Sequence, residues 1–534
     1  MRYTFYKFFI LLSMIALIVS CANRGTPSGG EIDVDPPKIT RSVPENFSTE
    51  FKGNEIRIYF DEYVKIKNVQ KQLIISPPMT NEPDITPLGT ASKYIKIVIK
   101  DTLQPNTTYA FNFGQSIVDN NEENPYPYYK YVFSTGTYID SLSVKGNIVD
   151  AENRTVDTFV SVMLYEVDST YNDSVVYNKK PKYVTNTLDS VTDFSIENIK
   201  AGTYKLVALK DENRNFTYQQ KTDKIGFLDQ IITVPTDSVY TIKLFKEDLD
   251  FKAFRPKQEA GQKIAFGYEG DYKDTQIELL GDKPDGLVER ITKDKAKDTL
   301  YYWYNKNLER DSTLFVVSNK QYRDTLTHKF RDIKKDTLVV NALRSGNMNF
   351  DKDFEIEGSI PFTLLREDLI KIIDKDSVDV PFTTKFDQLH NIYTFKFEKK
   401  ESNNYKIQML PEALTDFFGN VNDTLNYNVR TRAYSDFANI RVTLKNAKYP
   451  VIVQLTDDKG VVKYEQFAEQ PKPFDFRFIN TGDYYIRVVY DTNGNQKWDT
   501  GNYLKKIQPE RISYYDRLIE ASANWDLIEE FILE

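Results

Sequence analysis

Oxygen-bearing side chains recur at regular positions in one run near the C-terminus. Asp491, Asn493, Asn495 and Asp499 occupy positions 1, 3, 5 and 9 of this run, and Lys497 offers a backbone carbonyl at position 7. Oxygen ligands at this spacing are those with which a protein loop wraps Ca²⁺. These five residues are therefore a candidate calcium site, and the ion would have a structural role.

Two departures from the calcium pattern leave a second interpretation open. Position 6 is Gln496 instead of glycine, and position 12 is Asn502 instead of a bidentate glutamate. Asn and Asp also form turns by hydrogen bonding to their own backbone, so an Asx-rich turn explains the same residues. A similar loop begins at Asp211, but its position 9 is Gln219 and it runs on to Asp223, which favours the turn there.

Cys21 is the only cysteine of the chain, and it follows an apolar run from Phe8 to Val19 that is preceded by Arg2 and Lys7. A basic start and a short apolar core are typical of a secretory signal. The sequence Ile18-Val19-Ser20-Cys21 resembles the lipobox of bacterial lipoproteins. That resemblance implies that Cys21 is acylated, becomes the new N-terminus and anchors the chain in a membrane; the alternative is a plain signal or a single N-terminal helix.

The residues after Cys21 indicate which membrane holds the anchor. Residues 21–38 are small and polar, which is typical of a flexible tether. Ala22 is not the aspartate that retains many lipoproteins of this kind at the inner membrane, so the resemblance implies the outer membrane. No acidic residue precedes Glu31, so the side of the membrane stays open between the periplasm and the surface.

Residues that could catalyse a reaction are scarce and scattered. His328 and His390 lie in different expected domains without a His, Cys or Glu partner at metal spacing, and we expect both at the surface or at strand ends. Carboxylate pairs such as Asp61-Glu62 lie on strands, where adjacent side chains point to opposite faces. The net charge of −8 argues against nucleic acid. We expect no enzyme and, calcium apart, no cofactor.

The candidate residues named above must be positioned by short strands, along which apolar and polar residues alternate. Ile56, Ile58 and Phe60 share one expected face, and the same alternation recurs at Ile95–Ile99 and Tyr109–Phe113. The phrases Val43-Pro44-Glu45-Asn46, Ile58-Tyr59-Phe60-Asp61-Glu62 and Phe133-Ser134-Thr135-Gly136 resemble the immunoglobulin-like domain of bacterial S-layer proteins. The resemblance covers residues 39–137 and implies a β-sandwich with a spacer or binding role.

A second module occurs twice. Gly202-Thr203-Tyr204 is followed by a strand and Asp211, and Gly482-Asp483-Tyr484 is followed by a strand and Asp491 with the same offsets. Both copies resemble prealbumin-like sandwiches and cover residues 138–247 and 433–534.

The immunoglobulin-like segment is also repeated more faintly. Tyr405 and Asp416 correspond to Tyr109 and Asp119, which predicts a second immunoglobulin-like domain at 347–432. With a strand-rich segment at 248–346, the expected fold is all-β, a tandem of immunoglobulin-like and prealbumin-like β-sandwiches.

Two further patterns could mark surfaces. We expect the tyrosines of Pro125–Tyr129 to pack against a neighbouring sandwich, with sugar stacking as the alternative, and Trp525 to lock the last strand. A triplet of Asp, Ser or Thr, and an aliphatic residue resembles an O-glycosylation acceptor, although we favour the other explanation, a turn that begins a strand. Examples are Asp101-Thr102-Leu103, Asp140-Ser141-Leu142, Asp173-Ser174-Val175, Asp298-Thr299-Leu300, Asp336-Thr337-Leu338 and Asp423-Thr424-Leu425.

These features together predict a lipid-anchored outer-membrane protein that is a structural or protein-binding component of the cell envelope. Its expected partners are the membrane, through lipidated Cys21, and an outer-membrane protein. The alternative is a glycan-binding accessory lipoprotein, which exposed, coplanar aromatic side chains on one face of a sandwich would favour.

Overall fold

The computed structural model describes residues 33–188, 192–306, 308 and 311–533, so Cys21 and most of the expected tether lie outside the described residues. Almost all of its regular structure is β-strand, which confirms the all-β class. No helix in the described part is long and apolar enough to cross a membrane. The chain divides into two compact units: Met1–Ser143 with Lys182–Leu188 and Ile196–Ala201, and Val144–Pro181 with Asp189–Ser195 and Gly202–Glu534.

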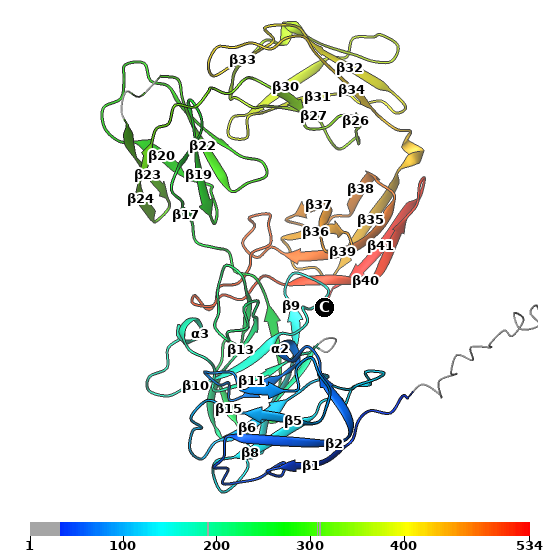
Figure 1. Cartoon of the computed structure of the whole chain (residues 1–534). Coiled ribbons are helices and arrows are strands. Elements are labelled where there is room, and N and C mark those ends of the chain that lie inside the picture. Colours follow the sequence, from blue (N-terminus) through cyan, green and yellow to red (C-terminus); the bar gives the residue numbers. More distant parts are fainter. Residues whose placement is uncertain (1–32, 189–191, 307, 309–310, 534) are drawn as a thin grey trace, which may run out of the picture. The chain divides into compact units, whose positions relative to one another are not determined.

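The first unit contains an immunoglobulin-like sandwich of two sheets (Figure 1). One sheet has the order β1-β2-β5-β4, with β7 paired to β2, and the other has the order β3-β6-β8. The elements of this unit are β1 (Ile39–Val43), β2 (Glu55–Ile66), α2 (Val69–Gln72), β3 (Ile74–Ser76), β4 (Asp84–Thr86), β5 (Ser92–Val98), β6 (Thr108–Asn112), β7 (Ile117–Asp119), β8 (Lys130–Ser134) and β11 (Tyr183–Asn186).

The alternation expected from the sequence builds the core of this sandwich. Ile56, Ile58, Ile95 and Ile97 are fully buried, and Phe111 meets them from the other sheet. Burial of each such side chain stabilises the fold by about 1.5–3 kcal/mol. The alternating residues of β2 and β5 that point outward remain partly exposed, so this sheet has one buried face and one solvent face.

Two short segments beyond residue 143 belong to the first unit because hydrogen bonds tie them to it. The Val184 backbone N–H donates to Ser76 Oγ at 3.1 Å, and Asn198 Nδ2 donates to the Asp140 carbonyl at 2.9 Å. The expected boundary between residues 137 and 138 and the other expected domain limits stay predictions.

The second unit begins with the first prealbumin-like copy. Its sheets include the order β10-β13-β14, with β15 also paired to β13, and a parallel pairing of β9 with β16. The elements here are β9 (Leu142–Asp150), β10 (Ser161–Glu166), α3 (Val175–Asn178), β12 (Asp193–Ile199), β13 (Gly202–Lys210), β14 (Lys224–Phe227), β15 (Ile232–Val234) and β16 (Val239–Leu244).

The segment expected to be strand-rich forms a sandwich around Tyr302 and Phe315. Its sheets have the orders β17-β19-β22-β21, with β18 on β19, and β20-β23-β24. The strands are β17 (Lys252–Ala253), β18 (Lys257–Ala260), β19 (Lys263–Glu269), β20 (Gln276–Leu279), β21 (Glu289–Lys293), β22 (Thr299–Tyr304), β23 (Ser312–Asn319) and β24 (Tyr322–Lys329).

The segment that echoes the first sandwich has three sheets around Phe354, Phe395 and Ile407. Their orders are β25-β27-β31-β30, β26-β34-β32-β29 and β28-β33. The elements are β25 (Val340–Ala342), β26 (Gly346–Asn347), β27 (Phe354–Gly358), β28 (Phe362–Leu365), η1 (Glu367–Leu369), β29 (Ile370–Ile373), β30 (Phe382–Asp387), β31 (Ile392–Phe397), β32 (Asn404–Met409), β33 (Leu414–Asp416) and β34 (Leu425–Arg430).

The second prealbumin-like copy completes the unit and repeats the topology of the first. Its sheets are β38-β35-β41 and β37-β36-β39-β40, and β41 runs parallel to β35 as β16 runs parallel to β9. The elements are η2 (Tyr434–Asp436), β35 (Ala438–Lys445), β36 (Val451–Thr456), β37 (Val462–Ala468), β38 (Phe474–Ile479), β39 (Gly482–Tyr490), β40 (Ile512–Ala521) and β41 (Asp526–Ile532).

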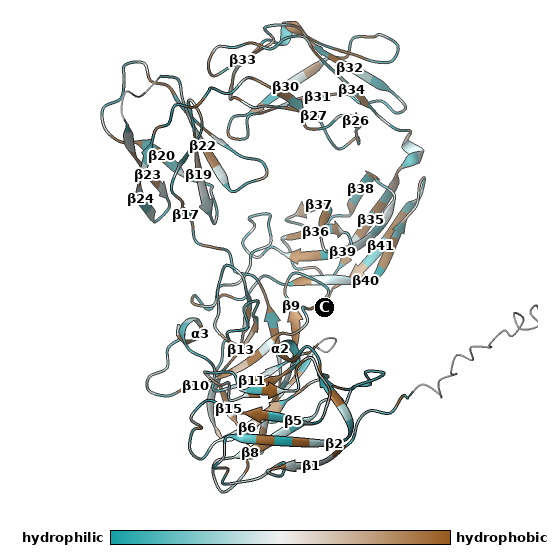
Figure 2. Cartoon of the chain, in the orientation of Figure 1, coloured by the Kyte–Doolittle hydropathy of each residue, from teal (hydrophilic) through white to brown (hydrophobic). Residues whose placement is uncertain are grey.

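The central strands of both copies are buried on both faces. All six residues of β36 are buried, as are five of the six residues of β10, and Figure 2 shows apolar segments along β36 and β39. A strand of an antiparallel sheet with one wet face would alternate instead. The outer faces of these strands must therefore be covered by other parts of the same unit.

Candidate functional site

The predicted calcium loop follows β39, and its first residue closes it as a turn. Asp491 is fully buried, and its two carboxylate oxygens accept hydrogen bonds from the backbone N–H groups of Asn495 (3.1 Å) and Gln496 (2.8 Å). Gln496 adopts a positive φ of 65° at the position where a calcium loop has glycine. The first carboxylate thus caps the loop backbone.

The other predicted ligands surround Asp499. Asn493 Nδ2 donates to Asp499 Oδ2 at 2.5 Å, Asn495 Nδ2 donates to the same oxygen at 2.7 Å, and Lys497 Nζ lies 3.3 Å from Asp499 Oδ1. A calcium ion would need the two amides turned so that their oxygens, not their nitrogens, face the carboxylate. Within the described residues no three His, Cys, Asp or Glu side chains form a metal-binding group. Calcium at this loop stays a prediction.

Glu510 is a residue of this loop that motif reasoning missed. One of its carboxylate oxygens accepts from the Thr492 backbone N–H and hydroxyl, both at 2.7 Å, and the other accepts from the Asp499 N–H at 3.1 Å. Trp498 Nε1 donates to the Glu510 carbonyl at 3.0 Å. Glu510 lies 11 residues beyond Asp499, the last residue of the motif, so the spacing within the motif could not identify it.

The corresponding loop of the first copy buries two aspartates. Asp211 Oδ2 accepts from the Phe216 N–H at 2.7 Å, and Asp223 Oδ2 accepts from the Gln219 N–H at 2.8 Å. Burial, with a further contribution from the charge of Asp223, raises the pKa of the Asp211 carboxyl above its usual range. Both copies therefore use the repeated aspartate to cap a loop, as the Asx-turn interpretation expects.

The chain beyond Asp499 packs into the first copy. Tyr503 is 1% exposed, and its backbone N–H donates to the buried carboxylate of Glu247. Its ring lies 5.2 Å from that of Phe227 and 6.4 Å from that of Tyr177, between centroids. Burial raises the pKa of the Tyr503 hydroxyl well above its ordinary value, so this side chain is neutral at any physiological pH.

Polar contacts flank Tyr503. Lys506 Nζ lies 3.1 Å from Asp173 Oδ2, and Gln508 Nε2 donates to Asp229 Oδ1 at 3.0 Å. A Cβ on Gly501 would lie 2.6 Å from the Phe245 ring, so only glycine permits this approach. Residues 500–508 are therefore shaped to the surface of the first copy.

A buried arginine makes a second contact between the two copies. Arg487, on β39, is 4% exposed; its Nε donates to Gln454 Oε1 at 2.7 Å and its Nη1 donates to the Glu152 carbonyl at 2.9 Å. The Tyr514 hydroxyl donates to the same carbonyl. The turn after β9 thus covers the outer face of β36 and β39, which explains why these strands are buried on both sides.

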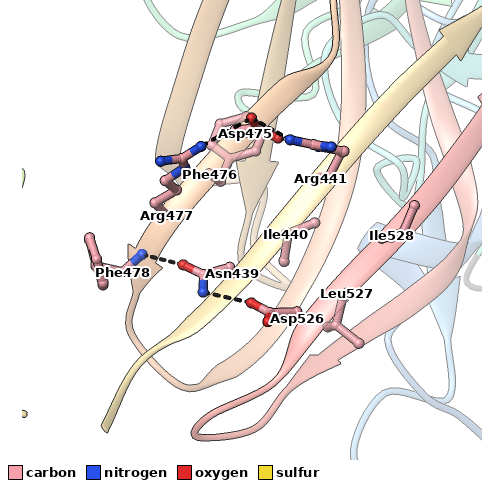
Figure 3. A pocket seen from close by; sticks show the side chains of 10 residues that line it. All are labelled: Asn439, Ile440, Arg441, Asp475, Phe476, Arg477, Phe478, Asp526, Leu527 and Ile528. Atoms are coloured by element: carbon pink, nitrogen blue, oxygen red, sulfur yellow. Dashed lines mark hydrogen bonds and ion pairs between the residues drawn. The ribbon is translucent and has the colours of Figure 1, made fainter. Parts of the chain in front are cut away.

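A shallow hollow of about 430 Å³ lies on the other sheet of the second copy, β38-β35-β41 (Figure 3). Arg441 holds Asp475 through Nε at 2.5 Å and Nη2 at 2.9 Å, and Arg477 approaches the same carboxylate to 3.7 Å. Asn439 donates to Asp526 at 2.7 Å and accepts from the Phe478 N–H at 2.9 Å. These polar groups pair with one another across the strands, as in an ordinary solvent-facing sheet.

The two histidines lie in different environments. His328 was expected at the surface or a strand end. It is 1% exposed inside the sandwich formed by β17–β24, the third along the chain, where its Nε2 lies 2.9 Å from Gln258 Oε1. As the next-to-last residue of β24 it lies at a strand end, as expected, but it is not at the surface, because β24 turns it inward toward Phe315 and Phe330. His390 is partly exposed, with Nδ1 2.9 Å from Asp387 Oδ2 and Nε2 3.3 Å from the Tyr272 hydroxyl.

The structure differs from both aromatic expectations. In Pro125–Tyr129, Tyr126 and Tyr129 pack on the core of the first sandwich, which is their own, and Tyr128 is 51% exposed. Trp525 does not lock the last strand, because its side chain is 52% exposed. The backbone does so instead, since the Asn439 N–H donates to the Trp525 carbonyl at 2.8 Å.

The Asp-Ser or Asp-Thr triplets have no single structural role. Leu142 and Leu425 begin strands, whereas Leu103 and Leu338 lie in loops and Val175 begins α3. The central residue is exposed in five of the six examples: Thr102, Ser141, Ser174, Thr337 and Thr424. Modification of these hydroxyls stays a prediction.

The sequence model of one family, the bacterial Ig-like domain, matches residues 33–135. This segment is the first sandwich, with sheets β1-β2-β5-β4 and β3-β6-β8. The first sandwich is therefore similar to bacterial Ig-like domains. The match agrees with the resemblance to S-layer domains and covers this part of the chain only.

Solved structures share low overall similarity with the chain. Domains 1–6 of the surface layer protein SbsC are 10% identical, with 91% of this chain and 67% of that chain covered and a TM-score of 0.16. The Bacillus anthracis TIE protein is 11% identical, with 95% and 76% covered and a TM-score of 0.15. A Bacteroides ovatus protein of a mixed-linkage glucan utilization locus, SGBP-B, solved with a mixed-linkage heptasaccharide, is 11% identical, with 71% and 91% covered and a TM-score of 0.17. No curated protein matches the chain.

Proposed function

We propose that this chain is a non-catalytic, lipid-anchored protein of the outer membrane that acts as a structural or protein-binding component of the cell envelope. Lipidated Cys21 would hold it in the membrane, and an outer-membrane protein would be its partner. One acyl chain binds a membrane only marginally, and two or more hold a protein stably. The first sandwich directly follows the tether, so the anchor would bring it close to the membrane.

The observation that most supports a structural role is the packing between the two prealbumin-like copies. Their contacts use the buried side chains of Arg487 and Tyr503 and the segment of residues 500–508, which follows the candidate calcium loop. Arg487 and Tyr503 are thus engaged in holding these two copies together. A chain that uses its polar groups in this way is suited to present surfaces to partners.

Purification of the full-length lipoprotein from membranes in mild detergent, followed by mass spectrometry, tests this function. The matched control is the Cys21→Ala variant, which keeps every folded domain. We expect one stoichiometric outer-membrane protein to co-purify with the anchored form and to be depleted with the variant. Reproducible absence of any partner, or turnover of a hydrolase substrate that one carboxylate substitution abolishes, would contradict the proposal.

A further inference from the structure

One solvent-facing sheet of the first sandwich carries basic and aromatic side chains together. They form two adjacent rows across β1, β2 and β5: Arg41, Tyr59 and Tyr94 lie directly opposite one another in the first row, and Arg57 and Lys96 lie opposite one another in the second. We call these five residues the tyrosine–arginine face. Neighbouring strands are about 4.8 Å apart, so the rows extend about 10 Å across the sheet.

The arginines and tyrosines of this face are in contact. The Arg41 guanidinium lies 4.2 Å from the centre of the Tyr59 ring, and that of Arg57 lies 5.7 Å from the centre of the Tyr94 ring. The two rings are 5.6 Å apart and inclined by 40°. A stacked guanidinium is held in place while its N–H groups stay available to a ligand. Tyr94 is 39% exposed, so the face is accessible.

The charges of this face are not balanced. Arg57 and Lys96 are directly opposite one another on antiparallel strands, where like charges destabilise a sheet. Among the described residues, Glu55 is the carboxylate that offsets them, with its oxygens 2.6 Å from Arg57 Nε and 3.8 Å from Lys96 Nζ. Three cations and one carboxylate leave an excess of positive charge on a chain whose net charge is −8. Arrangements that break a local stability rule are typical of binding sites.

We propose that the tyrosine–arginine face binds an anionic polysaccharide whose carboxylate groups pair with Arg41, Arg57 and Lys96. Arginine forks bind carboxylates through two parallel hydrogen bonds, which favours a carboxylate over a neutral sugar. The three cations lie on three successive strands, so a polymer with regularly repeated charges can contact all of them at once. The tyrosines hold the guanidinium groups in place between these contacts.

This proposal goes beyond the envelope role proposed above and does not depend on it. A protein partner could be absent while the polysaccharide binds, and the reverse also holds. A negative result in the co-purification therefore leaves the polysaccharide proposal unaffected, and a negative result in the polysaccharide test leaves the envelope role unaffected. Because the rings of Tyr59 and Tyr94 are inclined by 40°, they are not the coplanar aromatic pair that would favour the glycan-binding alternative.

Affinity electrophoresis of the full mature chain in gels with polygalacturonate, and with neutral dextran for comparison, tests the proposal. We expect polygalacturonate but not dextran to retard the protein, with less retardation as salt rises. The double variant Arg41→Gln/Arg57→Gln should weaken binding by roughly tenfold or more. Arg441→Gln is the matched control, because Arg441 is an exposed strand arginine that also holds a carboxylate, and it should bind like the unchanged chain.

A second variant keeps the test informative if the double variant folds poorly. Glu55→Gln removes the carboxylate that competes for Arg57 and Lys96, so it should strengthen binding to polygalacturonate. If the side chains of this face only stabilised the sheet, Glu55→Gln would not strengthen binding to polygalacturonate. The proposal is overturned if the unchanged chain is not retarded at low salt, if Arg441→Gln weakens binding as much as the double variant, or if the face binds vesicles of anionic lipid but not the polysaccharide.

Discussion

Buried aspartates recur at equivalent places in the four sandwiches that the sequence pairs with one another. Asp119, Asp211, Asp416 and Asp491 are all at least nine-tenths buried, and each accepts hydrogen bonds from the backbone N–H groups of the loop that follows it. A buried carboxylate needs such partners, because an unpaired one would be costly. The spacing in the sequence predicts the repeated aspartate, but its role as a loop cap is visible only in the tertiary structure.

His328 makes the stability of the third sandwich depend on pH. Burial lowers the pKa of His328 below its ordinary value of 6.5, so the folded state keeps this side chain neutral. The unfolded state takes up a proton as pH falls through about 6.5, and folding stability is therefore lost below that pH. We expect the melting temperature of this sandwich to fall between pH 7.5 and pH 5, and to fall less in His328→Gln.

Differential scanning calorimetry of both proteins across this pH range measures the effect. The introduced glutamine would retain a donor for Gln258 but would not titrate. The other histidine, His390, is common to both proteins and cancels in the comparison. An identical pH dependence in the variant would show that His328 does not carry the effect.

The two prealbumin-like copies are joined at strands that are buried on both faces. β36 and β10 are buried on both faces, and their sequences, Val451-Ile452-Val453-Gln454 and Ser161-Val162-Met163-Leu164, lack the alternation of a strand with one wet face. This lack of alternation in the sequence indicates that both faces of the strand are covered, and no motif expresses it. The covering segments are the turn at Glu152 and the loop at residues 500–508.

Arg487→Ala tests this joint. The substitution removes the hydrogen bond to the Glu152 carbonyl and leaves Gln454 Oε1 without its buried donor, which should cost about 1–3 kcal/mol. We expect lower thermal stability of both copies and faster amide hydrogen exchange at residues 150–154. Arg477→Ala, on the exposed face of β38 in the same sandwich, is the control and should change neither. Unfolding that affects only the second copy would show that the two are not coupled.

At the scale of the whole molecule, the anchor decides where the chain resides. If Cys21 is lipidated, Cys21→Ala should move the protein from the membrane fraction to the soluble fraction, because no acyl chain remains to be buried in the bilayer. Ser20→Ala keeps a small residue before the cysteine and should leave the protein in the membrane. Fractionation with detection by immunoblot measures both variants. Retention of Cys21→Ala in the membrane would contradict lipid anchoring.

The sequence by itself determined the all-β class, the inward residues of the first sandwich and the duplicated module. These depend on local spacing: a period of two along a strand, and equal offsets from Gly202 to Asp211 and from Gly482 to Asp491. The burial of Ile56, Ile58, Ile95 and Ile97 and the shared parallel pairing of β9 with β16 and β35 with β41 agree with these predictions.

Only the tertiary structure decided which residues from distant segments meet. Glu510 closes the loop at Asp491, Arg487 reaches Glu152, and Arg41, Arg57 and Lys96 align across three strands. The common face of Arg41, Arg57 and Lys96 depends on strand register, because a shift of one residue would turn every side chain of a strand to the opposite face; the contacts of Glu510 and Glu152 depend on where loops fold back. Register is set by packing of the whole sandwich, which is why spacing within one segment could not predict these contacts.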